Sequence, residues 1–233
     1  MPKVSSNVLI IFIKYPQAGR VKTRLAKKIG KRNAANLYRL FVEAVLKRTE
    51  GKNFKRIICY TPLDKEKRIK KWLAGNGLEF CSQEGRDLGE RLFNVFRFAL
   101  GSSAARRVVT IGSDSPMIDR EVVNSAFKAL ETKHCVLGPA LDGGYYLIGL
   151  SLFNKEAFRG IDWGTKKVLG QTLDKLKKAK ISCGLLEPSF DVDTYNDISY
   201  LEEKLSIHRQ RNPRGLKPIS SALRRIRHSY PLK

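Results

Sequence analysis

Short apolar runs alternate with helix-like segments along most of the chain. Residues 8–13 form a continuous apolar run, which is the pattern of a strand covered on both faces of a parallel sheet. Apolar residues then recur at helical spacing over positions 37–45, and residues 56–61 give a second buried strand. Further helices are expected near residues 64–74, 87–100, 119–130, 167–178 and 194–205. The alternation predicts a Rossmann-like α/β fold of three α/β/α layers, with its ligand beyond the carboxyl ends of the strands.

One pair of expected strands breaks this alternation. Residues 134–140 and 145–150 are both apolar, and only the turn Leu-Asp-Gly-Gly at 141–144 separates them. Such a short connection joins antiparallel strands, because a parallel crossover needs a dozen or more residues. We therefore expect a mixed, mostly parallel central sheet.

The charge of the chain constrains its partners. Lys and Arg number 45 against 22 Asp and Glu, a formal charge of +23, which favours nucleotides, phosphorylated substrates, nucleic acid or acidic lipid. Residues 204–233 hold nine Lys and Arg and no acid. We expect one domain at residues 1–203 and a basic, partly helical C-terminal tail at residues 204–233.

The cysteines and the N-terminal run bear on localisation. Cys59, Cys81, Cys135 and Cys183 each lie in a strand-like run without a C-x-x-C pair, so we expect buried free thiols in a reducing cytoplasm. The apolar run at residues 8–13 is too short for a membrane span or a signal peptide. The sequence predicts a cytoplasmic protein without a transmembrane segment.

A basic loop follows the first expected strand. In an α/β sheet phosphates bind at this end of a strand, so the loop is a candidate phosphate site formed by Lys14, Gly19, Arg20, Lys22, Thr23 and Arg24. The loop matches neither G-x-x-x-x-G-K-[ST] nor G-x-G-x-x-G, which disfavours a P-loop ATPase and a Rossmann dehydrogenase. The cations at 27, 28, 31 and 32 are expected to be solvated.

Several aspartates are candidate metal ligands. Asp114 follows the expected strand at 108–111, and Asp191 and Asp193 lie two residues apart, so that an extended chain would point them the same way. Carboxylates with substrate phosphates are typical ligands of Mg²⁺. Asp193 and Asp197 could instead cap the helix expected from residue 194.

Two glycine-containing segments are candidates for contacting an acceptor. Asp142 precedes Gly143 and Gly144, and Tyr145 begins the next strand; a plain tight hairpin is the alternative. Trp163, Gly164 and Thr165 precede a helix expected to begin near residue 165, whose free amides could hold an anion; a packing Trp before a capped helix is the alternative. The positions of the three histidines, and the absence of G-x-S-x-G, disfavour covalent catalysis.

Five segments, in this order, resemble a bacterial and archaeal family of glycosyltransferase-A-like proteins in the nucleotide-diphospho-sugar transferase superfamily: residues 14–26, 110–116, 137–150, 162–165 and 191–198. The resemblance covers about residues 7–203. It implies that the loop at 14–25 wraps nucleotide phosphates, that Asp114 and Asp193 hold a divalent ion, and that the segment at 142–146 faces the acceptor. Residues 22–25 and 191–194 are also similar to 2-phospho-lactate guanylyltransferases.

Three functions remain open at this point. The leading hypothesis is nucleotidyl transfer, dependent on Mg²⁺ or Mn²⁺, from a nucleoside triphosphate to a phosphorylated acceptor, with Lys22, Arg24, Asp114 and Asp142 as catalytic candidates. The first alternative is a glycosyltransferase that uses a nucleotide-sugar donor and a sugar-like acceptor. The loop has only Gly19 where superfamily pyrophosphorylases usually have a glycine-rich loop, and Asp114 is followed by Ser-Pro where glycosyltransferases usually have D-x-D, so neither signature is matched. The second alternative is a non-catalytic protein that binds polyanions weakly through its tail, where apolar residues recur at helical spacing beside Arg224, Arg225 and Arg227.

Overall fold

The chain divides into two compact units in the computed structural model, which describes residues 7–75, 77–101, 105–211 and 214–231. Unit 1 comprises residues 1–13, 51–112 and 120–190, and unit 2 comprises residues 14–50, 113–119 and 191–233. Each unit is built from segments that are distant in the sequence.

The sheet belongs to unit 1 apart from Lys14, the last residue of β1. Over the described residues, its seven strands have the order β3-β2-β1-β4-β6-β5-β7. They are β1 (Asn7–Lys14), β2 (Lys55–Thr61), β3 (Glu79–Ser82), β4 (Arg107–Gly112), β5 (Cys135–Pro139), β6 (Tyr145–Leu150) and β7 (Cys183–Leu185). Strand β6 runs antiparallel to β4 and β5, whereas β1–β4, β2–β3 and β5–β7 are parallel pairs. The expectation of a mixed, mostly parallel sheet with one hairpin is confirmed.

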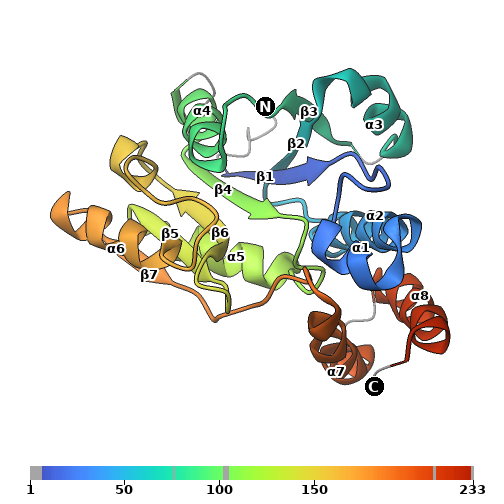
Figure 1. The fold of residues 1–233 in the computed structure, drawn as a ribbon. Helices are drawn as coiled ribbons and strands as arrows, with labels where there is room; N and C mark the ends of the chain where they lie inside the picture. The colour runs from blue at the N-terminus through green and yellow to red at the C-terminus, as the bar shows by residue number, and fades with distance from the viewer. Residues whose placement is uncertain (1–6, 76, 102–104, 212–213, 232–233) are drawn as a thin grey trace. The chain divides into compact units, whose positions relative to one another are not determined.

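Helices cover both faces of the sheet within unit 1 (Figure 1). Helix α4 (Leu88–Gly101) and helix α6 (Val168–Lys178) place Phe96 and Leu176 in one cluster with Ile10 of β1. Leu130, which follows α5 (Arg120–Ala129), lies beside Gly149 on the opposite face. The remaining helical segments of unit 1 are η1 (Leu63–Lys65), α3 (Glu66–Trp72) and η2 (Lys155–Ala157). The expected three α/β/α layers are therefore present.

The four cysteines lie in facing pairs on parallel strands. Cys59 faces Cys81 across β2 and β3, and Cys135 faces Cys183 across β5 and β7. All four are free thiols, as expected, but Cys81 and Cys183 are only half-buried because they lie on the edge strands. Hydrogen bonding to Cys81 and burial both raise the pKa of Cys59.

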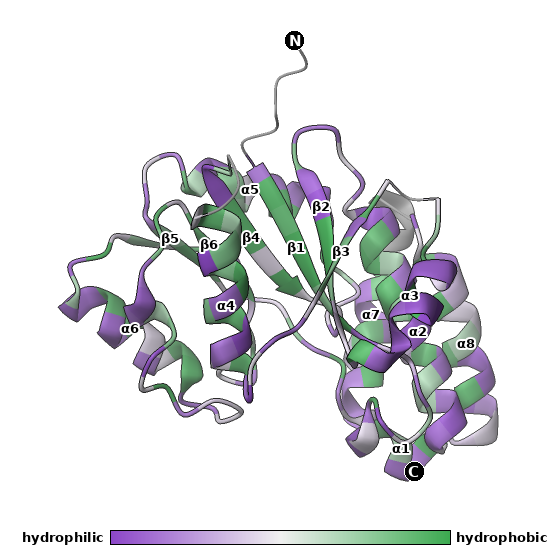
Figure 2. Ribbon diagram, turned by 90° about the horizontal axis from the view of Figure 1, so that it is seen from above, coloured by the Kyte–Doolittle hydropathy of each residue, from purple (hydrophilic) through white to green (hydrophobic). Residues whose placement is uncertain are grey.

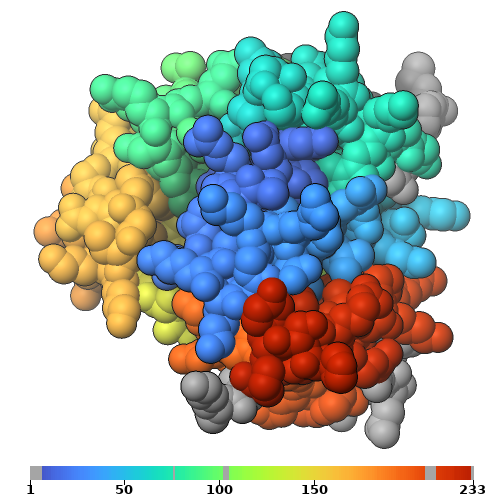
Figure 3. Space-filling view, turned by 45° about the vertical axis from the view of Figure 1, so that its right-hand side comes forward, coloured from blue at the N-terminus to red at the C-terminus, as the bar shows by residue number. Residues whose placement is uncertain are grey.

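Unit 2 is helical. It contains α1 (Thr23–Ile29), α2 (Lys31–Arg48), α7 (Tyr195–Arg211) and α8 (Leu216–Ser229). Helix α8 is amphipathic, with its apolar side chains buried, and it contacts α2 and α7 (Figures 1 and 3). Its Arg227 Nη2 lies 2.9 Å from Glu202 and 2.8 Å from Ser199, both on α7. Figure 2 shows alternating polar and apolar residues along α8.

The tail is thus largely helical, and residue 203 falls inside α7, which continues six residues beyond the end expected at 205. Tail residues 212–213 and 232–233 lie outside the described residues. In the part of the chain that the structure describes, no helix is long and apolar enough to cross a membrane.

Candidate functional site

The basic loop after β1 ends in an unusual backbone conformation. Gly19 has φ +79°, and Lys22, the residue before α1, has φ 46° and ψ 46°. This left-handed region is uncommon for a residue with a Cβ atom and is a feature that clusters at functional sites. The backbone of the loop is further fixed by the Arg20 amide, which donates to the Gln17 carbonyl at 3.0 Å.

Lys22 is the centre of an ionic cluster in unit 2. Its Nζ atom lies 2.5 Å from Asp114 Oδ1 and 2.9 Å from Asp193 Oδ1. The Lys22 side chain is 3% exposed, while that of Asp114 is 46% exposed, so the cluster is open to solvent on the Asp114 side. Burial alone would lower the pKa of Lys22, but Asp114 and Asp193 outweigh burial and hold it above the usual value.

Arg24 extends this cluster on α1. Its Nη2 atom lies 2.9 Å from Asp193 Oδ2, so the two oxygens of Asp193 face two different cations. Burial would raise the pKa of Asp193, but Lys22 and Arg24 keep it below its usual value. Asp193 is therefore a carboxylate held in its charged form.

Backbone contacts bring the aspartates together. The Val192 amide donates to the Asp114 carbonyl at 3.1 Å, which joins the segment before α7 to the segment after β4. Asp197 accepts from the amides of Asp193 and Thr194 at 2.9 and 2.6 Å. The capping interpretation is thus confirmed for Asp197, while the side chain of Asp193 is left for the cations.

Asp191 differs from the other two predicted metal ligands. It accepts a short hydrogen bond from the Ser115 hydroxyl and has no described contact with Lys22 as close as those of Asp114 and Asp193. Burial and the nearby Asp114 raise the pKa of Asp191 to about 7. Two carboxylates that share the Lys22 cation and a third whose pKa is raised make up the acidic part of the site.

Three polar side chains of this site, those of Tyr38, Ser113 and Ser115, were not predicted. The Tyr38 hydroxyl contacts Ser113 Oγ at 2.8 Å and accepts from the Lys14 amide at 2.9 Å. Lys22 Nζ lies 6.0 Å from the ring centroid of Tyr38 and 6.0 Å from that of Phe41. Tyr38 and Phe41 lie on the apolar side of α2. In the sequence, their helical spacing indicates core packing, and it gives no sign that the Tyr38 hydroxyl makes polar contacts. The small residues around Asp114 were the available signal for Ser113 and Ser115.

The remaining phosphate candidates lie at the surface of unit 2. Lys14, Arg20 and Thr23 are exposed, and Gly19 is half-buried with the Lys31 side chain 3.4 Å from the place of a Cβ atom. Lys22 is thus the only buried cation among the predicted phosphate ligands, all of which lie within the described residues.

Asp142, Gly143, Gly144 and Tyr145 lie in unit 1, in the turn and first strand residue between β5 and β6. Asp142 is exposed and accepts from the Gly144 amide at 3.0 Å, as in the tight hairpin alternative. A Cβ atom on Gly143, which has φ +91°, would lie 2.3 Å from the Lys166 carbonyl oxygen. The absence of a side chain at Gly143 therefore allows the backbone before α6 to lie close to it.

Trp163, Gly164 and Thr165 also lie in unit 1. The helix expected near residue 165 begins later, at Val168, because Thr165 Oγ1 donates to the Asp162 carbonyl and accepts from the Lys167 amide in a turn. Trp163 packs edge-on against Tyr145 with ring centroids 6.2 Å apart. The packing alternative thus describes Trp163, while Gly164 and Thr165 are exposed.

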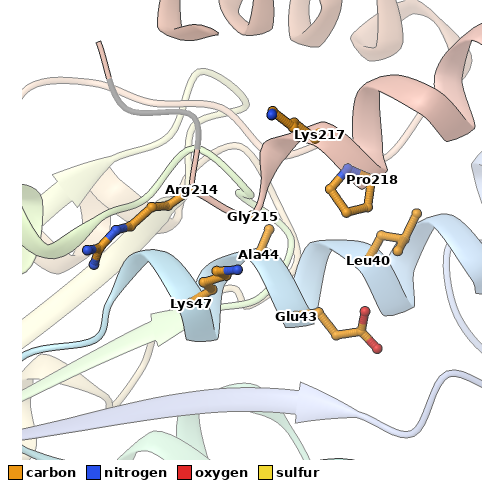
Figure 4. Close-up of a pocket in the computed structure, with 8 residues that line it drawn as sticks. All are labelled: Leu40, Glu43, Ala44, Lys47, Arg214, Gly215, Lys217 and Pro218. Atoms are coloured by element: carbon orange, nitrogen blue, oxygen red, sulfur yellow. The ribbon is translucent and has the colours of Figure 1, made fainter.

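A separate cavity of about 550 Å³ lies in unit 2 between α2 and the start of α8 (Figure 4). It is lined by Leu40, Glu43, Ala44, Lys47, Arg214, Gly215, Lys217 and Pro218. Its lining includes none of the predicted site residues, and its charged residues are Glu43 and the cations Lys47, Arg214 and Lys217.

The carboxylates of unit 2 suit a hard divalent ion in part. Mg²⁺ is usually bound by one or two carboxylates together with substrate phosphates and waters, and Asp114 and Asp193 supply that number. Among the described residues, no group of three or more His, Cys, Asp or Glu side chains forms a metal site. The donor set therefore fits a metal that a bound phosphate helps to hold.

The mixed sheet with helices on both faces defines the nucleotide-diphospho-sugar transferase fold. A candidate nucleotide-diphospho-sugar transferase from Desulfovibrio desulfuricans G20 is 33% identical, with a TM-score of 0.89 over 99% of this chain and 100% of that one. The expectation from the resemblance is thus confirmed for the fold.

The chain belongs to the family described as "Uncharacterized protein conserved in bacteria (DUF2064)", which matches residues 44–165. A 4-diphosphocytidyl-2C-methyl-D-erythritol synthase from Anaerococcus prevotii is 12% identical, with a TM-score of 0.54 over 87% of this chain and 98% of that one. A nucleotidyl transferase from Methanothermobacter is 13% identical, with a TM-score of 0.53 over 85% and 96%. At such identities the likeness establishes the fold. No curated protein matches the chain at a significant level.

Proposed function

We propose that this protein is a divalent-cation-dependent nucleotidyltransferase that joins a nucleoside triphosphate to a phosphorylated small molecule. The observation that carries the proposal is the cluster of Lys22, Arg24, Asp114 and Asp193, which follow β1 and β4 and precede α7 in the chain. A buried cation beside acidic oxygens, next to a loop with further exposed cations, suits a triphosphate and the metal ion that accompanies it.

The cations of unit 2 would bind and orient the triphosphate. Lys14 at the end of β1 and Arg20 on the loop are exposed and can reach phosphate oxygens from solvent, while Arg24 presents a planar guanidinium at the start of α1. Lys22 contributes a fixed charge from a buried position. Charge neutralisation of this kind is the main requirement of in-line phosphoryl chemistry.

The reaction needs no strong base. An ionised oxygen of the acceptor phosphate attacks the α-phosphorus, the bond between that phosphorus and the oxygen bridging to the β-phosphorus breaks, and pyrophosphate leaves with the electron pair. Asp114 and Asp193 would hold the divalent ion, which neutralises the charge of the phosphate oxygens when bound.

The acceptor is proposed to bind unit 1. Asp142 is exposed in the segment that follows β5, and Gly164 and Thr165 are exposed in the segment that precedes α6. They offer polar side chains or backbone groups to an acceptor. Gly143 and Trp163 would shape these segments, because both are engaged in packing. Tyr145 and Gly144 complete the acceptor set.

A second candidate function is glycosyl transfer from a nucleotide sugar. The observation in its favour is the 33% identity to the candidate nucleotide-diphospho-sugar transferase, which spans nearly the whole chain. The same cations would then hold a diphosphate leaving group, and Asp142 would act as base or acceptor ligand.

The products distinguish the two reactions. Purified protein is incubated with Mg²⁺, each nucleoside triphosphate and a panel of sugar phosphates and phosphorylated hydroxy acids, and pyrophosphate is measured; a parallel series with UDP- and GDP-sugars measures nucleoside diphosphate. Pyrophosphate formed only with an acceptor supports nucleotidyl transfer. Formation of nucleoside diphosphate alone would support glycosyl transfer instead of nucleotidyl transfer. If neither product forms with any combination of donor and acceptor, both proposals are contradicted.

A further inference from the structure

Lys22 lies where a divalent ion would bind the two carboxylates. Its Nζ atom is 2.5 Å from Asp114 Oδ1 and 2.9 Å from Asp193 Oδ1, and its side chain is only 3% exposed. Arg24 takes the other oxygen of Asp193 at 2.9 Å. A metal ion that bound both carboxylates would therefore have to share or replace contacts that an ammonium group already makes.

The charges of the four groups in direct ionic contact cancel. Lys22 and Arg24 supply two positive charges, and Asp114 and Asp193 supply two negative ones. A divalent ion added to this set would leave a net positive excess in a partly buried place, where an uncompensated charge is costly. A polyanionic triphosphate that entered with the metal would compensate for that excess.

Two aromatic rings lie beside the Lys22 ammonium group. The rings of Tyr38 and Phe41 lie with their centroids 6.0 Å from Lys22 Nζ, within the range of a cation–π attraction. The left-handed backbone of Lys22 sets the start of its side chain, but the side chain has four rotatable bonds by which its end can move.

We propose that Lys22 is the resident cation of this site, and that a divalent ion binds tightly only together with a nucleoside triphosphate, when the Lys22 ammonium moves from the carboxylates to the phosphates. The metal is then brought by the substrate and is not a permanent cofactor. This inference rests on the proposed function for the identity of the polyanion, but the competition between Lys22 and the metal does not need it.

A titration with Mn²⁺ alone, followed by calorimetry and by the loss of the free-ion electron paramagnetic resonance signal, tests the competition. The wild-type protein should bind Mn²⁺ weakly, and Lys22→Met, which keeps the length of the side chain and removes its charge, should bind it about tenfold more tightly or better. Lys27→Met is the matched control, because Lys27 is an exposed lysine of α1, the helix that Lys22 precedes, and its affinity should equal that of the wild type.

Equal or weaker Mn²⁺ binding in Lys22→Met would overturn the inference, whatever the nucleotide experiments show. Conversely, tighter Mn²⁺ binding in a protein that binds no nucleoside triphosphate would retain the competition and reject the proposed function. The two failures are therefore distinguishable.

Chemical labelling of the wild-type protein provides a second test that does not depend on a folded variant. Lys22 should be protected from acetic anhydride without metal, and its modification, measured by peptide mass spectrometry, should increase as Mn²⁺ is raised to millimolar concentration. Lys27 should be modified equally throughout. Protection of Lys22 that stays constant across the titration would contradict displacement.

Discussion

At the scale of the residue, the site depends on one lysine in an unfavourable backbone conformation. Lys22 has φ 46° and contacts two carboxylates from distant parts of the chain. The sequence identified Lys22, Arg24, Asp114 and Asp193 as candidates because of their positions after expected strands or before an expected helix. It could not show that Lys22 pairs with both aspartates, since such contacts depend on tertiary structure.

Loss of either cation should slow the proposed reaction. Lys22→Ala and Arg24→Ala should each lower kcat/KM on the order of 10²-fold, because a preorganised positive charge beside the phosphates is removed. Lys27→Ala, at an exposed position of α1, should retain wild-type activity. Steady-state kinetics of pyrophosphate release measure all three, and an unchanged rate in Lys22→Ala or Arg24→Ala refutes the role given to that residue.

Asp191 should make stability depend on pH. Its pKa in the folded protein is raised from 3.8 to about 7, so between these values the folded state binds more protons than the unfolded state. The free energy of unfolding should therefore fall as pH rises through this window. Asp191→Asn stays neutral and should lack this part of the fall, so the stability of the variant relative to the wild type should rise between about pH 4 and 7.

Urea unfolding in EDTA, at several pH values, measures this difference in the metal-free protein. Parallel curves for the wild type and Asp191→Asn would show that the Asp191 carboxyl is not perturbed by burial and by Asp114.

At the scale of the element, the hairpin and α8 show what the sequence predicted and what it left open. The hairpin followed from the short turn at 141–144 and is confirmed. The neighbour of Gly143 could not be predicted, because the Lys166 backbone is far along the chain. The amphipathic pattern of α8 fits both a membrane surface and a protein core, and only the structure shows that Leu223 and its neighbours are buried within unit 2.

Gly143 should be much less tolerant of a side chain than Gly170. Gly143→Ala places a Cβ atom 2.3 Å from the Lys166 carbonyl oxygen at φ +91°, so it should destabilise the protein by about 1–3 kcal/mol or more. Gly170 lies inside α6 with no atom within 4 Å of the added Cβ, so Gly170→Ala should stabilise it by about 0.5–1 kcal/mol. Thermal unfolding of both variants provides the test, and equal effects would contradict the close approach.

Helix α8 should be part of the folded core and not a free tail. Leu223 is 1% exposed, so Leu223→Ala should cost about 2–5 kcal/mol of stability, whereas exposed Arg224→Ala should change it by less than about 0.5 kcal/mol. Denaturant unfolding measures both. A Leu223→Ala variant as stable as the wild type would mean that α8 is detached in solution.

The same helix bears on weak polyanion binding through the tail, which stays a proposal. Arg224 and Arg225 are exposed, so replacing both with Glu tests nucleic-acid binding without removing the buried residues of α8. Truncation after residue 203 would cut α7 and is therefore a poor test.

At the scale of the whole molecule, alternating apolar runs and one short turn were sufficient to predict the three layers and the mixed sheet, because each strand is a local pattern. The division into two compact units could not be predicted, since each unit joins segments that are remote in the sequence. For the function, the excess of positive charge pointed only to polyanions. The particular polyanion depends on the cluster around Lys22.

Calorimetric titration with the four nucleoside triphosphates tests the central claim most directly, namely that this cluster binds a triphosphate together with a divalent ion. The wild-type protein should bind at least one triphosphate with Mg²⁺ and lose that binding in EDTA. Asp114→Asn should weaken it by about tenfold or more, and exposed Glu203→Gln on α7 should leave it unchanged. Binding that persists unaltered in Asp114→Asn, or no binding of any triphosphate with Mg²⁺, would contradict the claim.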